Sequence, residues 1–198
     1  MKALVMKDLH VLRATLKYYL FLVVVFTLGL RDMGSIFIIL YAAMLPYTAL
    51  AYDERAHFEL QAAAMPYSWR DLVLSKYLLG WLVMLVVLPV SIAIALLCQQ
   101  LGWGAFYIEQ QLSAVFAGMM LMAVCLPIMF RKGVEVGRIL NILLIVVTSA
   151  AAMTIFAVLA GFVQNAVLLW LIVAAVAVAA SWGSVKLSEK WYKKRIME

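Results

Sequence analysis

The residues best suited to chemistry lie in one polar stretch, residues 52–71, between two long apolar runs. The stretch brings together acids, bases and a histidine, among them Asp53, Arg55 and His57. Neither histidine of the chain lies in an H-E-x-x-H metal motif, and no phosphate-binding loop of the G-x-x-x-x-G-K-S/T type occurs in the sequence. We therefore expect this stretch to bind a partner outside the membrane. The chain is not expected to be an enzyme, to hydrolyse ATP by itself, or to bind a metal or another cofactor.

The composition places these polar residues on a membrane protein. Of the 198 residues, 68% are hydrophobic and 13% are charged, whereas a soluble domain has about 45–50% apolar and about 25% charged residues. The apolar runs are long and lack the alternation of barrel strands. Because helices satisfy their own backbone polar groups in lipid, we predict an all-α polytopic membrane protein that forms a single transmembrane domain.

Six transmembrane helices are predicted from apolar runs of near-spanning length. The expected spans are about residues 18–30, 35–52, 72–97, 110–130, 139–163 and 166–185. Residues 1–17 are amphipathic and predict an N-terminal helix in the membrane interface, with its bases at the lipid headgroups. Residues 53–71 form a cytoplasmic connection and residues 186–198 a basic tail. Pro46 predicts a kink in the second span.

The positions of the bases predict the orientation of the chain. Every Lys and Arg except Arg31 lies at the N-terminus, in the second-to-third or fourth-to-fifth connection, in the tail, or, for Lys76, near the start of the third span beside that connection. Cytoplasmic segments of membrane proteins are enriched in Lys and Arg, so both termini are expected to be cytoplasmic. The net charge of +6 is thus assigned to helix ends beside membrane lipids, and no nucleic acid is expected as a partner.

The predicted spans have no ionisable residue at mid-depth. Carriers that use ion gradients usually have such residues, so a gradient-driven carrier is the least favoured hypothesis. If the protein moves a cargo, its energy is expected to come from a different subunit.

The polar stretch itself predicts a short helix. Asp53 and Glu54 suit a first helical turn, residues 56–65 are good helix formers, and Pro66 is expected to end the helix. Ser68 or Asp71 is expected to cap the next helix. This short helix would expose His57, Phe58, Glu59 and Gln61 at the cytoplasmic side. The residues alone favour equally a docking helix and an amphipathic connector that rests on lipid.

The same stretch resembles the signature of ABC-2-type permeases. More narrowly, it is similar to small stand-alone permeases related to bacterial exporters of amphipathic peptides such as phenol-soluble modulins. The residues that carry the resemblance are Asp53-Glu54-Arg55, Leu60, Met65-Pro66-Tyr67-Ser68-Trp69-Arg70, Val73 and Ser75-Lys76-Tyr77. Trp69 between Ser68 and Arg70 departs from the pattern.

The resemblance implies a permease of the bacterial cytoplasmic membrane that pairs with a second permease chain, as a homodimer or a heterodimer. It also implies a coupling helix that docks on a separate ABC ATPase subunit, which holds ATP and Mg. The expected docking residues are Asp53, Glu54, Arg55, His57, Phe58, Glu59, Gln61, Pro66 and Arg70. A second, smaller contact or a plain positive-inside signal is expected from Arg131, Lys132, Glu135 and Arg138.

The cargo expected for a pathway without charges is apolar or amphipathic, such as a peptide. Methionines suit an adaptable wall, although methionine in a membrane helix is more often a packing residue. The candidates are Met44, Met84, Met119, Met120, Met122 and Met153. The alternative function is a non-transporting membrane protein that acts in immunity or assembly.

Overall fold

The chain is all-helical in the part that the computed structural model describes, namely residues 2–30, 34–63, 67–103, 106–134 and 166–197, with a few residues between 146 and 158. This confirms that the fold is all-α, as predicted. The helices are α1 (Lys2–Leu30), α2 (Gly34–Ala42), α3 (Leu45–Arg55), α4 (Phe58–Ala63), α5 (Trp69–Gln100), α6 (Ile108–Lys132) and α8 (Ala166–Met197).

Three of the described helices are long and apolar enough to cross a membrane, namely α5, α6 and α8. They contain the predicted third, fourth and sixth spans. The predicted second span is divided between α2 and α3, with a turn just before Pro46. Most of the predicted fifth span lies outside the described residues, so a total of six spans stays a prediction.

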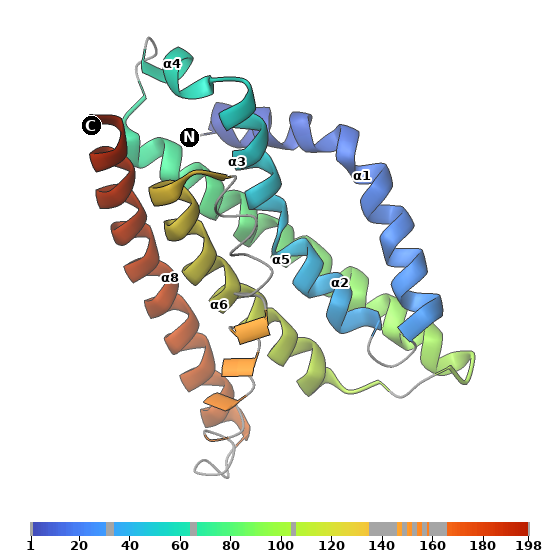
Figure 1. Ribbon diagram of the computed structural model, residues 1–198. Coiled ribbons are helices and arrows are strands. Elements are labelled where there is room, and N and C mark those ends of the chain that lie inside the picture. Colours follow the sequence, from blue (N-terminus) through green and yellow to red (C-terminus); the bar gives the residue numbers. More distant parts are fainter. Residues whose placement is uncertain are drawn as a thin grey trace.

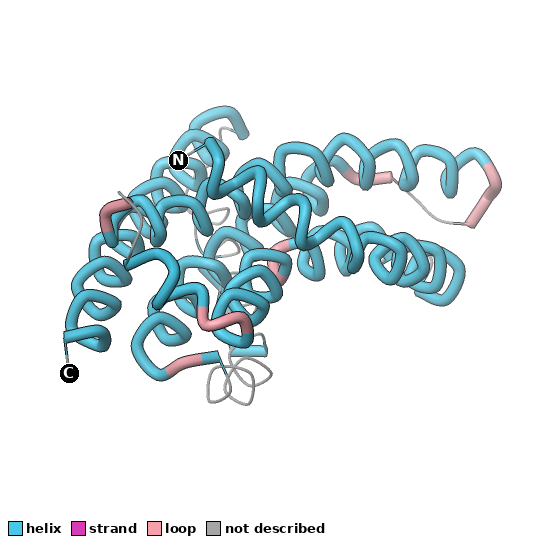
Figure 2. Tube along the Cα trace, turned by 90° about the horizontal axis from the view of Figure 1, so that it is seen from above, coloured by secondary structure: helices cyan, strands magenta, loops and turns pink. Residues whose placement is uncertain are grey.

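The predicted interfacial helix and first span form one bent helix, α1. Its two parts, Ala3–Arg13 and Lys17–Phe26, differ in direction by 57° and would together count as a fourth span. The N-terminal part of α1 lies at the end of the bundle where α4 and both chain termini also lie (Figure 1). The later parts of α1 and α5 extend to the same side, away from α8 (Figure 2).

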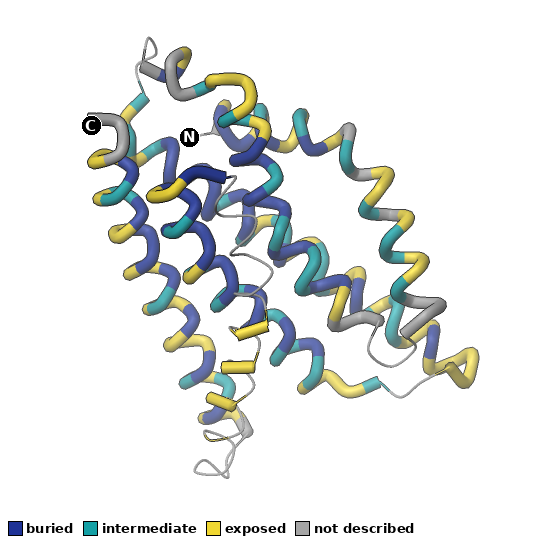
Figure 3. Tube along the Cα trace, in the orientation of Figure 1, coloured by how far each residue is buried: buried dark blue, intermediate teal, exposed yellow. Residues whose placement is uncertain are grey.

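In the core of the bundle, α5 and α6 contact each other at two glycines, Gly80 and Gly118. A Cβ added at Gly80 would lie 2.4 Å from the Met122 sulfur and 3.0 Å from Pro46 Cγ, and one added at Gly118 would lie 2.5 Å from Met84 Cε. Each methionine therefore fills the space left by a glycine of the opposite helix. Small residues permit this close approach of helices in membranes. Figure 3 marks the buried residues along the helices in dark blue.

Buried hydroxyl groups connect α8 to the same core. The hydroxyl group of Tyr77 on α5 lies 2.5 Å from Ser184 Oγ and 2.9 Å from Ser188 Oγ on α8. Ser184 also donates to the carbonyl of Ala123 on α6 at 2.6 Å. These contacts give α8 a defined register against α5 and α6, because a buried hydroxyl group needs a partner.

Candidate functional site: the polar connection and its anchors

The polar connection, residues 53–71, begins in the last turn of a helix, whereas the sequence predicted that it begins with the first turn of one. The acids Asp53 and Glu54 belong to the last turn of α3, so their predicted place in the first turn of a coupling helix is wrong. The short helix α4 begins only at Phe58 and is six residues long. Residues 64–66, including Pro66, lie outside the described residues.

His57 separates the two helices by its backbone conformation. Its φ of 49° is left-handed, and its N–H donates to the carbonyl of Glu54 at 3.1 Å. Glycine usually occupies this position after a helix, because a side chain there costs conformational energy. The carboxylates near the end of α3 also face the negative pole of its dipole, so they require partners.

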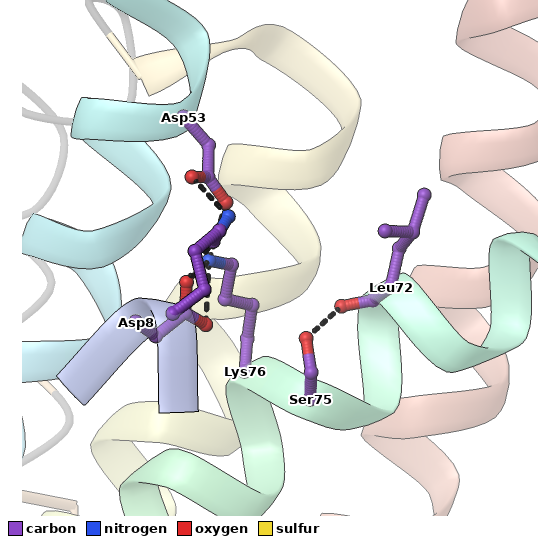
Figure 4. Close-up of polar contacts among 6 residues, drawn as sticks. Asp8, Asp53, Leu72, Ser75 and Lys76 are labelled. Carbon is purple, nitrogen blue, oxygen red and sulfur yellow. Dashed lines mark hydrogen bonds and ion pairs between the residues drawn. The ribbon is translucent and has the colours of Figure 1, made fainter. Parts of the chain in front are cut away.

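Asp53 finds its partners in an ion cluster of four residues, Lys7, Asp8, Asp53 and Lys76. Figure 4 shows the contacts of Lys76 with Asp8 and Asp53. Lys76 Nζ lies 2.8 Å from both carboxylate oxygens of Asp8 and 2.5 Å from Asp53 Oδ2. Lys7 Nζ lies 2.6 Å from Asp53 Oδ1 and 3.3 Å from Asp8. The four formal charges cancel, so α1, α3 and α5 meet at an electrically neutral junction.

The ion cluster is largely shielded from solvent. The side chain of Asp8 is 1% exposed and that of Lys76 is 5% exposed, whereas that of Lys7 is 29% exposed. The ammonium group of Lys7 also lies 3.5 Å from the centroid of the Phe58 ring. Phe58, which was expected to dock a partner, is half-buried against the core and forms part of this anchor.

The role of Asp8 was not predicted from the sequence, where Asp8 was expected among the polar positions of the N-terminal helix. A signal was present, because Leu4, Asp8 and Leu12 recur every four residues and so share one helix face. All three are buried. Asp8 therefore lies within the apolar stripe, opposite Lys76, which lies on the buried face of α5 with Val73 and Tyr77.

Glu54 links the polar stretch to the fourth-to-fifth connection, which begins after α6. Its carboxylate accepts a hydrogen bond from the Val134 N–H at 2.7 Å. Val134 directly follows Gly133, the C-cap of α6, whose φ is 81°. The two regions predicted to contact a partner thus meet through this bond. Of the second region, Arg131 and Lys132 are exposed, while Glu135 and Arg138 lie outside the described residues.

The remaining predicted docking residues divide into two groups. Arg55, His57, Gln61 and Arg70 are exposed, whereas nothing is described of the Glu59 side chain. We call Arg55, His57 and Gln61 the exposed patch, since they belong to one continuous stretch at the end of α3 and in α4.

Ser68 caps α5 in a capping box, as predicted. The Asp71 N–H donates to Ser68 Oγ at 3.2 Å, and Ser68 returns bonds from its own N–H and hydroxyl group to the Asp71 carboxylate. These bonds from Ser68 favour the charged carboxylate and hold the pKa of Asp71 below its usual value. The box defines where the polar connection ends.

The six candidate methionines have different surroundings. Met84 and Met122 are buried against glycines, Met44 and Met119 lie at the edge of the core, and Met120 packs on a smaller cluster with Phe116 and Ala117. Met119 also lines an open-sided apolar cleft of about 850 Å³ between α5, α6 and α8. Met153 lies outside the described residues. A cargo role for these residues stays a prediction.

No group of His, Cys, Asp and Glu that could hold a metal is present among the described residues. Comparison with curated proteins found no match, and neither did comparison with solved structures. The family model described as "ABC-2 family transporter protein" matches residues 3–193. The chain therefore belongs to the ABC-2 transporter family, whose members are non-catalytic membrane components of ABC transporters and in general associate with an ABC ATPase subunit.

Proposed function

We propose that the chain is the permease subunit of an ATP-driven exporter and that a separate ATPase subunit docks on the exposed patch. The observation that carries this proposal is the way in which the patch is attached. It follows directly on two partly buried anchors, since Asp53 bonds to Lys76 and Glu54 bonds to the N–H of Val134.

These anchors give the patch a mechanical connection to the membrane helices. Asp53 connects it to α5 and α1 through Lys76 and Lys7, while Glu54 connects it to the end of α6. Charge-assisted hydrogen bonds in a low-dielectric site are short and strong. A displacement of α4 by a closing ATPase would therefore move α1, α5 and α6 together.

The rest of the proposal concerns partners and cargo. ATP and Mg bind the ATPase subunit, a second permease chain completes the pathway, and both termini are cytoplasmic in a bacterial inner membrane. Both termini lie at the same end of the bundle (Figure 1), which supports their placement on one side of the membrane. The proposed cargo is apolar or amphipathic, because the predicted spans have no ionisable residue at mid-depth that could compensate a charged one.

The docking proposal predicts that Arg55→Glu combined with Gln61→Glu reduces capture of the ATPase at least about tenfold, since reversed charges oppose a complementary surface. The measurement is affinity purification of the tagged chain from its native cells, with quantification of the co-purified P-loop ATPase and its activity. Arg13→Glu is the matched control, because Arg13 is exposed but belongs to α1.

Full capture by the Arg55/Gln61 variant would refute the docking site. If the unmodified chain captures no ATPase in any mild detergent, the permease proposal fails and a non-transporting role replaces it. Glu54 and Phe58 are less suitable targets, because their replacement would disturb anchors within the protein itself.

His57 offers a second test, because its backbone and its side chain make separate contributions. His57→Gly is expected to raise the unfolding temperature slightly, by removing about 1 kcal/mol of left-handed strain, while weakening ATPase capture through loss of the imidazole. His57→Val is expected to lower the unfolding temperature. Thermal unfolding in detergent, measured beside ATPase capture, checks both effects. A His57→Gly variant less stable than the parent would contradict the backbone argument.

A further inference from the structure

We propose that the cleft between α5, α6 and α8 binds one anionic phospholipid, with an acyl chain in the cleft and the phosphate at the lysines of α8. The cleft has a volume of about 850 Å³ and is lined by apolar and small residues, apart from Ser181. This volume lies within the range of about 300–1,000 Å³ that is usual for ligand sites. The proposal requires only that these helices span the bilayer and does not depend on transport.

The length of the cleft fits one leaflet. On α8 its lining extends from Ala174 to Trp182, a rise of about 12 Å at about 1.5 Å per residue. Half of a hydrocarbon core of about 30 Å is about 15 Å. The cleft therefore suits an acyl chain that enters from the leaflet at the end of the bundle where the termini lie.

The end of the cleft nearest to the termini is marked by an aromatic ring and a cation. Trp182 is 62% exposed, and Lys186 Nζ lies 3.6 Å from the centroid of its ring. Tryptophan favours the headgroup level of membranes, where one part of the ring is apolar and the other is wet. Trp81 of α5 lies on the other side of the cleft.

The charge of α8 above the cleft is complementary to a phosphate. Trp182, Lys186 and Lys190 recur every four residues and so lie on nearly one face, with a turn of about 40° at each step. Both lysines are exposed. Glu189 is the one acid between residues 183 and 195, against five Lys and Arg residues. The face that is apolar within the cleft thus becomes basic beyond Trp182.

An anionic phospholipid matches both parts of this face. A zwitterionic lipid would supply the acyl chain without a net charge for the lysines, and a free phosphate would leave the cleft unfilled. Attraction to anionic lipid contributes about fivefold in binding for each basic residue near the surface. The predicted selectivity is therefore for the headgroup charge, with the acyl chain setting the position.

The test is native mass spectrometry of the full chain, equilibrated in mild detergent with equal amounts of phosphatidylglycerol and phosphatidylcholine. We expect the chain to retain phosphatidylglycerol preferentially. Lys186→Gln with Lys190→Gln is expected to lower that retention at least about tenfold. Val178→Trp, which fills the cleft at a residue that is 62% exposed, is expected to abolish retention of both lipids.

Two variants serve as controls. Lys17→Gln removes another exposed lysine next to an aromatic ring, since Lys17 Nζ lies 5.3 Å from the centroid of Tyr18. Leu171→Trp enlarges an exposed residue of α8 that is not part of the lining. Both are expected to retain phosphatidylglycerol as the parent chain does.

Three results would overturn the proposal. Equal retention of the two lipids by the parent chain would exclude selectivity for the anionic headgroup. Unchanged retention in the Lys186/Lys190 variant would exclude the lysines. A Val178→Trp variant that keeps its lipid but changes from dimer to monomer would show that a second copy of the chain, rather than a lipid, covers the cleft.

Discussion

Lys76→Met is expected to lower the free energy of unfolding by about 3 kcal/mol. Removing one partner of a buried ion pair typically costs about 3–5 kcal/mol, because the remaining charge is left without compensation. The carboxylate of Asp8, 1% exposed, would lose both of its 2.8 Å bonds. The lower end of the range applies because Lys7 Nζ still lies 3.3 Å from Asp8. Thermal and denaturant unfolding in detergent measure the effect.

A double variant tells whether the stability lost in Lys76→Met comes from the unpaired buried charge or from the changed size of the side chain. Asp8→Asn together with Lys76→Met removes one charge of each sign and leaves the 2.6 Å pair of Lys7 with Asp53. We expect it to recover more than half of the lost stability, since a neutral amide tolerates burial better than a lone carboxylate. Lys132→Met, at an exposed position, is the control. A double variant as unstable as Lys76→Met alone would show that packing, rather than charge, dominates.

Gly80→Leu is expected to destabilise the α5–α6 contact by about 2–3 kcal/mol. Extra methylene groups in a packed core typically cost about 1–3 kcal/mol, and here even a Cβ would meet Met122 at 2.4 Å and the ring of Pro46 at 3.0 Å. The methionine can move, but the proline ring cannot, so the strain is not relieved by a rotamer change alone. The unfolding temperature and the yield of monodisperse protein are the measurements.

Gly183→Leu is the matched control, because a Cβ at Gly183 meets nothing within 4 Å. It is expected to leave stability unchanged or to raise it slightly, since leucine favours helix more than glycine does. Combining Gly80→Leu with Met122→Ala removes one of the two obstacles and should restore part of the loss. Equal behaviour of the Gly80 and Gly183 variants would refute close packing at α5 and α6.

The helical class and the positions of three spanning helices were predictable from the length of the apolar runs. Each of these three runs is long enough to cross the hydrocarbon core of a membrane by itself. The cap at Ser68 was predictable for a similar reason, since its partner Asp71 lies three residues away. The family could also be recognised from the polar connection. Local signals of this kind need no knowledge of tertiary contacts.

The anchors of the polar connection could not be predicted because their partners are distant in the sequence. Asp53 bonds to a lysine 46 residues before it and to another 23 residues after it, and Glu54 bonds to a backbone group 80 residues away. The helix boundary was misplaced because acids near Asp53 favour a first turn when the dipole alone is considered. Tertiary ion pairs reverse that preference here.

The shielding of the ion cluster has a consequence for how the complex responds to ionic strength. Dissolved salt screens exposed charges strongly and buried pairs much less. The proposed ATPase contacts through exposed Arg55 should therefore weaken in concentrated salt, while the internal bonds of Lys76 to Asp8 and Asp53 persist. A wash with concentrated salt should then release the ATPase while the exposed patch keeps its shape. After dilution, the same permease should bind the ATPase again.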